Sequence, residues 1–120
     1  MQAPVFKTLN TPEVRNYVGN NPTRIYAYGK SLRGVLPPFI VWKVISSAPY
    51  CFVGGTKVGD RVQVQIDCYS KEDNILRQLS NVVGSVLLEA DVQSEKLNAK
   101  FNDELNLHQI SLIATFTQSK

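Results

Sequence analysis

Hydrophobic and polar positions alternate most regularly near the middle of the chain. From residue 61 to 68 the apolar side chains stand at even positions and the polar ones between them. Because successive side chains of an extended chain point to opposite faces, this pattern predicts a half-buried β-strand over residues 61–69. The run 39–45 is apolar on both faces apart from Lys43, which indicates a central strand, or one whose second face meets a partner. Turn residues and no helical period connect the two, so we expect antiparallel pairing.

Two segments carry helix signals. Thr11-Pro12-Glu13 combines an N-cap residue, a proline at the first helical position and an acid in the first turn, and Gly19 ends this short helix. After Ser70, which can cap a second helix, apolar residues from 75 to 87 recur at steps of three and four and predict one stripe packed on the sheet. Gly84 interrupts this stripe, and a close approach between helix and sheet would explain a glycine there.

The remaining segments complete the predicted architecture. Residues 24–28 read as a short strand and residues 107–117 as a last strand that pairs with the 61–69 strand or its neighbour, whereas 92–106 is polar and weakly patterned. The order helix, strand, strand, strand, helix, strand predicts an α+β fold with a mainly antiparallel β-sheet and helices packed on one face. The length of 120 residues fits a single domain over residues 1–120.

The charge is distributed unevenly along the chain. The net charge is +3, but residues 1–70 hold eight basic and three acidic side chains. No carboxylate stands between Glu13 and Asp60, a stretch that contains six basic residues: Arg15, Arg24, Lys30, Arg33, Lys43 and Lys57. This polarity indicates a face or a set of loops that meets something acidic. A solvated surface with uneven charge is the alternative, and the sequence leaves both open.

Composition and cysteine usage exclude several classes of protein. No apolar run approaches the length of a membrane helix, so we expect no membrane contact, and the first residues lack the pattern of a signal peptide. We therefore expect a protein that stays in the compartment where it is made. Cys51 and Cys68 stand 17 residues apart with only His108 as a further ligand, too few for a zinc site. We interpret both as buried thiols that act as small hydrophobes, and we expect no metal and no cofactor.

The candidate chemistry does not amount to an enzyme. His108 is the only histidine, no nucleophile stands in a recognisable catalytic context, and we interpret His108 as a structural residue at the start of the last strand. The stretch 54–59 resembles a phosphate-binding loop only briefly, because its lysine precedes the last glycine and a strand follows. Aromatic residues interleave with the basic stretch, as in binders of single-stranded nucleic acid, but no RNP-type motif is present. We therefore predict no catalytic residues.

The order of motifs resembles that of a known family. The run Arg24-Ile25-Tyr26, the stretch 36–46 (LPPFIVWKVIS) and the stretch 61–70 (RVQVQIDCYS) followed by an amphipathic helix are similar to the tail-completion proteins of long-tailed bacteriophages. These belong with the tail-terminator and head–tail joining proteins. The resemblance runs in order from Val5 to Thr117, with Val64-Gln65-Ile66-Asp67-Cys68-Tyr69 before a helix as its best anchor.

The resemblance implies a non-enzymatic virion protein. Members of the family are small α+β subunits that assemble, typically as a hexameric ring, on the head-proximal end of the tail tube. The ring ends tube polymerisation and joins the tail to the head connector, and DNA passes through its channel without sequence-specific binding. The implied partners are therefore other copies of the chain, the tube protein and the connector. The implied location is the virion, after assembly in the host cytoplasm.

Three basic residues of the carboxylate-free stretch are candidate contact residues of such a ring. Lys30, Arg33 and Lys57 fall in predicted loops and could meet an acidic tube, connector or DNA surface. Two alternatives to the tail-completion role remain open at this point. One is another neck or minor tail protein of the same fold, and the other is a small basic nucleic-acid-binding module, which salt-sensitive DNA affinity of a monomer would indicate.

Overall fold

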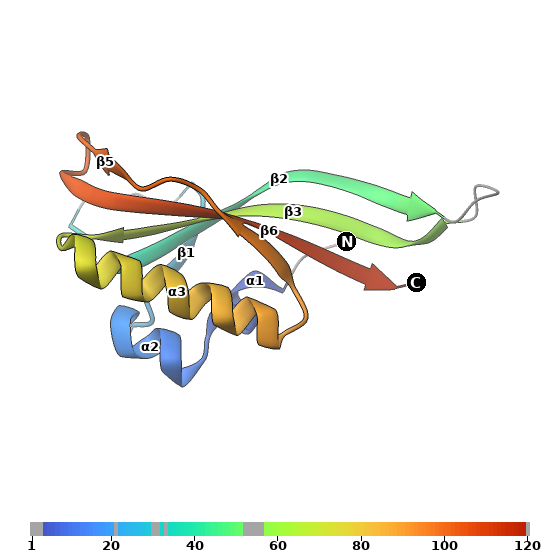
Figure 1. Cartoon of the computed structure of the whole chain (residues 1–120), viewed down its shortest axis with the longest axis horizontal. Helices are drawn as coiled ribbons and strands as arrows, with labels where there is room; N and C mark the ends of the chain where they lie inside the picture. The colour runs from blue at the N-terminus through green and yellow to red at the C-terminus, as the bar shows by residue number, and fades with distance from the viewer. Residues whose placement is uncertain (1–3, 21, 30–31, 33, 52–56, 120) are drawn as a thin grey trace.

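The chain folds into one twisted β-sheet with its helices on one face (Figure 1). The computed structural model describes residues 4–20, 22–29, 32, 34–51 and 57–119, and only the backbone at 47–51, 57–60, 118 and 119. The helices are α1 (Val5–Leu9), α2 (Pro12–Val18) and α3 (Asp73–Glu89). The strands are β1 (Ile25–Ala27), β2 (Phe39–Cys51), β3 (Lys57–Ser70), β4 (Gln93–Lys96), β5 (Lys100–Asn102) and β6 (Leu107–Ser119).

The sheet is mainly antiparallel and has the order β1-β2-β3-β6-β4, with β5 also paired to β6. β2 pairs antiparallel with β3, and β3 pairs antiparallel with β6 along almost its whole length. Both pairings confirm the predictions from sequence. The predicted α+β fold class is confirmed as well. The single parallel pair joins β1 to β2, with Tyr26 opposite Val41.

The main core lies between the sheet and the helices. The even positions of β3 and the alternate apolar residues of β6 are buried there, as the alternation predicts. α3 contributes a stripe of buried residues that packs on β3 and β6, while α1 and α2 pack beside α3 (Figure 1). Each large side chain removed from water in this layer contributes about 1.5–3 kcal/mol, so this layer is the main source of stability.

The helix boundaries agree with the sequence signals in part. Thr11 caps α2 as predicted, since its Oγ1 accepts from Val14 N at 3.4 Å. The Ser70 prediction is wrong by two residues, because Ser70 still belongs to β3 and Glu72 is the N-cap of α3. The close helix–sheet approach expected at Gly84 is also wrong, since a Cβ built there has no neighbour within 4 Å.

The central hairpin is longer than predicted. β2 continues from the predicted run through Pro49 to Cys51, and β3 begins at Lys57 rather than at residue 61. Gly59 and Asp60, which are turn residues in the sequence, sit in β3 opposite Tyr50 and Pro49. Pairing with β2 on one side and with β6 on the other therefore overrides the local turn preference.

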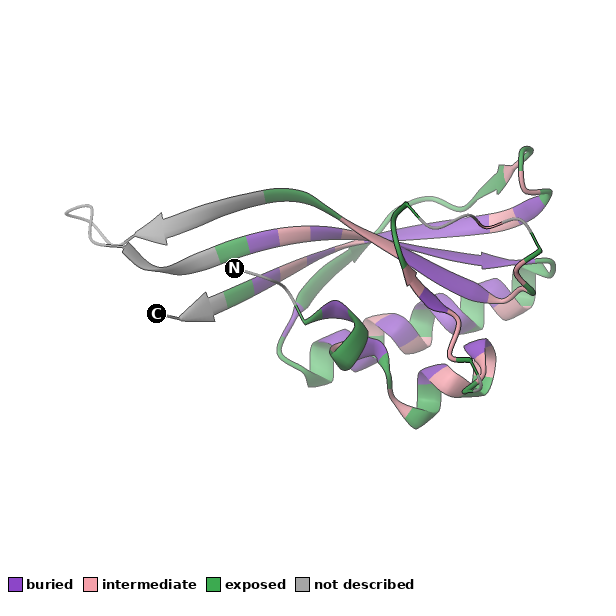
Figure 2. Cartoon of the chain, turned by 180° about the vertical axis from the view of Figure 1, so that it is seen from behind, coloured by how far each residue is buried: buried purple, intermediate pink, exposed green. Residues whose placement is uncertain are grey.

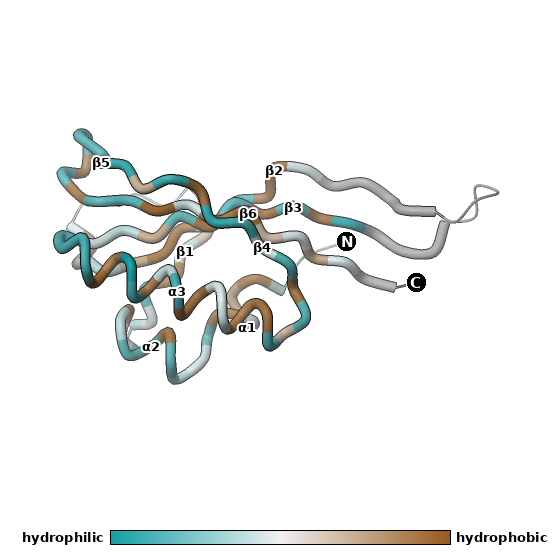
Figure 3. The backbone as a smooth tube through the Cα atoms, viewed as in Figure 1, coloured by the Kyte–Doolittle hydropathy of each residue, from teal (hydrophilic) through white to brown (hydrophobic). Residues whose placement is uncertain are grey.

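Three short elements were not expected from the sequence. α1 has only five residues, of which Val5 and Leu9 are buried. β4 and β5 lie in the polar segment, and Figure 3 shows them as mostly hydrophilic. All four β4 residues are exposed, so no alternation of burial marks this edge strand in the sequence.

Three strands project beyond the helix layer. We call this part the arm; it consists of residues 46–51 of β2, 57–62 of β3 and 116–119 of β6. It extends past the carboxyl end of α3 (Figure 1), and among the residues whose burial is described, most of the buried ones lie in the part of the sheet that the helices cover (Figure 2). A β-bulge between Val44 and Ser46 separates the arm from the body of β2. The molecule is elongated as a result, with extents of 50 × 28 × 23 Å.

Candidate assembly surfaces

The sheet face opposite the helices, which we call the outer face, carries a polar network across β3, β5 and β6. Ser111 Oγ and Gln65 Nε2 both donate to Asp67 Oδ1, at 2.6 and 3.0 Å. Gln109 Nε2 donates to Ser111 Oγ at 3.4 Å, and Asn102 Nδ2 donates to Gln109 Oε1 at 3.2 Å. Asp67 is only 9% exposed, so these bonds compensate the burial of its carboxylate.

An apolar cluster adjoins this network on the outer face. Phe39 and Tyr69 stack with ring centroids 4.9 Å apart, and Val41 and Leu107 are buried with them. The loop between β1 and β2 contributes Leu32 and Val35 to the same cluster. The second face of β2 is therefore covered in part by the chain itself. The sequence had left open whether a partner covers this face.

Two grooves flank this cluster. One of about 580 Å³ lies over the polar network and is lined by residues that include Tyr28, Lys43 and Asp67. The other, also about 580 Å³, is more apolar and includes Leu36, which is exposed, together with Val35 and Leu105. The outer face is thus concave on both sides of the stacked rings.

Burial changes the acidity of two neighbouring side chains of β3. Burial, with a smaller contribution from the negative charge of Asp67, raises the pKa of the Cys68 thiol to about 12. Burial and the same carboxylate raise the pKa of Tyr69 to about 12. Both groups are therefore neutral at physiological pH, and Cys68 acts as the small hydrophobe that the sequence predicted. The side chain of Cys51 lies outside the described residues.

Three of the six basic residues in the carboxylate-free stretch serve the fold itself. Arg15 donates to the backbone and side-chain oxygens of Asn10, at 3.2 and 2.9 Å. Arg24 donates to the carbonyl oxygens of Pro38 and Tyr17, and Lys43 Nζ lies 5.2 Å from the centroid of the Tyr28 ring. These three side chains therefore have partners within the chain itself.

The other three are the predicted contact residues. Lys30 and Arg33 lie outside the described residues, so the structure does not place them. Lys57 was expected in a loop and is instead the first residue of β3, with its backbone in register with Cys51; its side chain is not described. The structure therefore does not test whether the three lie together, and their role as contacts stays a prediction.

The described residues offer little catalytic chemistry. Among them, no group of three or more His, Cys, Asp and Glu residues is placed to hold a metal ion. His108 is half-buried and lies edge-on to the Phe101 ring, with centroids 5.2 Å apart. No described helix is long and apolar enough to cross a membrane.

The sequence analysis missed two features of these surfaces. The alternation placed Asp67 on the polar side of its strand. It did not predict the buried network, because one of the two donors to Asp67, Ser111, lies on β6, which is remote in sequence. The sequence analysis also missed the arm, although Pro49 could have indicated an open strand edge. Proline inside a strand is confined to sheet edges and bulges, and Pro49 pairs on one side only, with Asp60.

The family comparison decides the class of protein. The family described as "Tail completion protein gp17" matches residues 3–113, which is most of the chain. The chain belongs to this family. It is therefore a structural protein of a phage tail or neck, and its location is the virion.

The tail completion fold of this chain also has a solved counterpart. A chain from the structure titled "Virion of native gene transfer agent (GTA) particle" matches with a TM-score of 0.64 and 15% sequence identity, over 97% of this chain and 92% of that chain. At this identity the match shows the fold alone. No curated protein matches the chain in sequence.

Proposed function

We propose that this tail completion protein caps the head-proximal end of the tail tube, ends tube polymerisation and helps join the tail to the head. The observation that carries the proposal is the family match over residues 3–113. The similar fold of a chain in a gene transfer agent virion supports a place in a phage-like particle. The role is structural and involves no catalysis.

We further propose that the subunits act as a closed ring, with the hexamer as the expected form. Its neighbours would be the tube protein on one side and the head connector on the other, and DNA would pass through the channel without sequence-specific contacts. Assembly would take place in the host cytoplasm. The elongated shape and the arm support this arrangement, because a ring subunit has to bury surface against two copies of itself.

Two alternatives compete with the capping role. The first is another neck or minor tail protein of the same fold, which would assemble without stopping tube growth. A basic nucleic-acid-binding module is less well supported, because Arg15, Arg24 and Lys43 are engaged within the fold. Such a module would bind DNA as a monomer, with an affinity that falls steeply as salt rises.

The test is the solution mass across a concentration series, measured by light scattering with and without purified tail tubes. A discrete closed ring, or one that forms only on tubes, supports the proposal. Tube length in a polymerisation reaction then separates capping from other neck roles, because a cap added early should give shorter tubes. A monomer that ignores tubes at every concentration contradicts the proposal.

A further inference from the structure

Within the part of the chain that the structure describes, two strand edges of the arm have no partner. β1 pairs with β2 only as far as Trp42, and β4 pairs with β6 only as far as Thr115. Among the described strands, none pairs with the outer edge of β2 over residues 43–51 or with that of β6 over residues 116–119. Each edge therefore presents a row of backbone N–H and C=O groups that can pair with another strand.

The two open edges lie at the same level of the arm. Ser47 and Phe116 are both opposite Val62, and Tyr50 and Ser119 are both opposite Gly59. A neighbouring copy related by rotation about an axis along the arm would therefore bring the β6 edge beside the β2 edge without a large shift along the strands.

The base of the β2 edge is also apolar. Val44 and Ile45, at the bulge, are 50% and 44% exposed, although both are large hydrophobic side chains. The edges at the other end of the sheet are different. β1 has three residues, and β4 has four exposed residues that include Glu95 and Lys96. Short and charged edges are how proteins block strand pairing, so the arm is the better candidate for an intermolecular contact.

Strand direction determines how two such edges can meet. β2 and β6 both run antiparallel to β3, so they run in the same direction as each other. In a ring with rotational symmetry every copy has the same orientation, so β2 of one copy beside β6 of the next forms a parallel pair. Pairing β2 with β2 would instead close a two-fold dimer and leave both β6 edges open.

We propose that the outer edge of β2 in one copy pairs in parallel with the outer edge of β6 in the next, so that the arms close into one continuous barrel. This inference rests on the proposed ring and identifies the surface that holds it together. Three strands from each of six copies would give a barrel in the size range of about 16–18 strands that encloses an aqueous channel. Closure would also remove every open edge of the arm.

We call this contact between β2 of one copy and β6 of the next the seam. Cysteine cross-linking tests it. Ala48 and Thr117 both pair with Arg61, so within one copy they lie two strand spacings apart, about 10 Å. That exceeds the span of about 7 Å that a disulfide bridges, so a bond between these two positions has to join two copies. The background is Cys51→Ser, which removes the native thiol at the end of β2. The double variants combine Ala48→Cys with Thr117→Cys or, for a shift of two residues, with Ser119→Cys.

The expected result is a ladder of covalent multimers under mild oxidation, reversed by reductant. Each single variant should remain monomeric in denaturing gels, because the seam joins two different edges. The matched control combines Ala27→Cys with Ser94→Cys, on the outer edges of β1 and β4, and should give no ladder. In the unmodified chain, amide exchange in residues 116–119 should slow by about tenfold or more when the ring forms.

Other outcomes overturn the seam and separate it from the proposed function. Disulfide dimers from a single variant mean that like edges meet. A closed ring in light scattering without a ladder, and without slowed exchange in residues 116–119, means that the ring is held elsewhere, and only the seam fails. No ring and no ladder, with tubes present, contradicts both the seam and the ring.

Discussion

Asp67 is the residue on which the outer-face network converges. Replacing it with alanine leaves Ser111 and Gln65 without their acceptor in a largely buried site. We expect Asp67→Ala to lower the free energy of unfolding by about 1–3 kcal/mol, the usual cost of unsatisfied buried polar groups. Urea denaturation measures this change. Glu95→Ala, which removes an exposed carboxylate, is the control and should change stability by less than about 0.5 kcal/mol.

Cys68 and Tyr69 make the stability sensitive to alkaline pH. Their pKa values are about 12 in the folded chain, against ordinary values of 9.0 and 10.0. Between pH 9 and 12 the unfolded chain therefore releases protons that the folded chain keeps, so the free energy of unfolding falls as pH rises. Each group contributes a slope of up to about 1.4 kcal/mol per pH unit.

Urea denaturation at pH 8, 9 and 10 checks this dependence in the Cys51→Ser background. Cys68→Val removes the thiol and keeps an apolar side chain, so its stability should change less between pH 9 and 10. An equal slope in both proteins would show that Cys68 does not titrate on unfolding in this range.

At the scale of elements, two glycines show how backbone conformation decides the effect of one substitution. Neither Gly84, in α3, nor Gly34, in the loop before β2, has a neighbour within 4 Å of an added Cβ. Gly84 is helical, so Gly84→Ala should stabilise the protein by about 0.5–1 kcal/mol. Gly34 has a φ of 79°, so Gly34→Ala should destabilise it by about 1 kcal/mol.

Thermal denaturation of the two variants gives the signs directly. A stabilising Gly34→Ala would show that the loop can relax to a negative φ. If Gly84→Ala destabilises the protein, α3 approaches the sheet at this position as closely as the sequence suggested.

The elements that the sequence predicted share one property. β3, β6 and α3 each bury an apolar face and carry mostly polar residues on the other, so they leave a periodic pattern in the chain. β4 is exposed on both faces and α1 has five residues, so neither repeats long enough to be recognised. β3 extends back to Lys57 through its pairing with β2, and from Gly59 onward it also pairs with β6, a strand remote in sequence, which no local pattern contains.

At the scale of the whole molecule, the charge of the basic loops can be tested without knowing their geometry. The triple charge reversal of Lys30, Arg33 and Lys57 to Glu should weaken attachment of the ring to tubes or connectors by at least tenfold if these residues meet acidic partners. Sedimentation of the variant with purified tubes measures the bound fraction.

A matched triple variant separates charge at these sites from net charge. Reversal of Lys7, Lys71 and Lys100, which are exposed and outside the carboxylate-free stretch, changes the net charge equally and should leave attachment intact. If the first variant still forms rings and still attaches, the assignment of these three residues as contacts is wrong.

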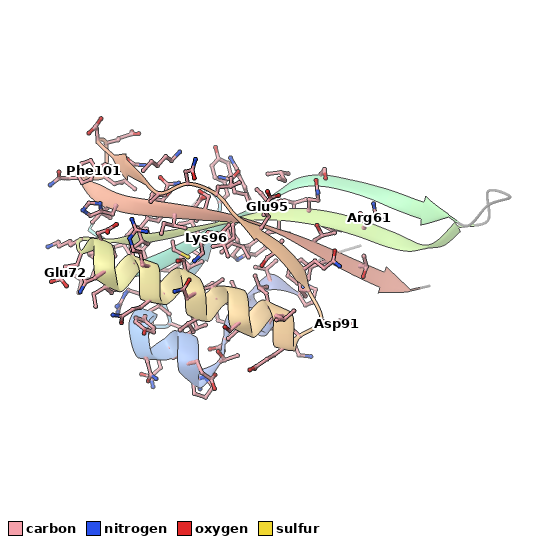
Figure 4. The ribbon with its side chains drawn as sticks, viewed as in Figure 1. Arg61, Glu72, Asp91, Glu95, Lys96 and Phe101 are labelled. Carbon is pink, nitrogen blue, oxygen red and sulfur yellow. The ribbon has the colours of Figure 1, made fainter. Side chains whose placement is uncertain are left out.

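The family was predictable from the order of motifs, but the arm and its edges were not. Figure 4 places Arg61 on the arm and Phe101 at the opposite end of the molecule, although alternation alone places Arg61 at the start of an ordinary strand. Which strand edges remain open depends on where β1 and β4 stop pairing, and this is a property of the assembled sheet.

The position of β6 in the sheet has a consequence for synthesis. β6 inserts between β3 and β4 and contributes Ile110, Leu112, Ala114 and Phe116 to the main core, yet it is the last strand of this sequence to leave the ribosome. β2 and β3 can form their hairpin early, but the sheet stays incomplete until β6 joins it. In the proposed contact between β2 and β6, a nascent chain therefore lacks one of the two edges that join neighbouring copies, so ring formation would have to wait until the chain is complete.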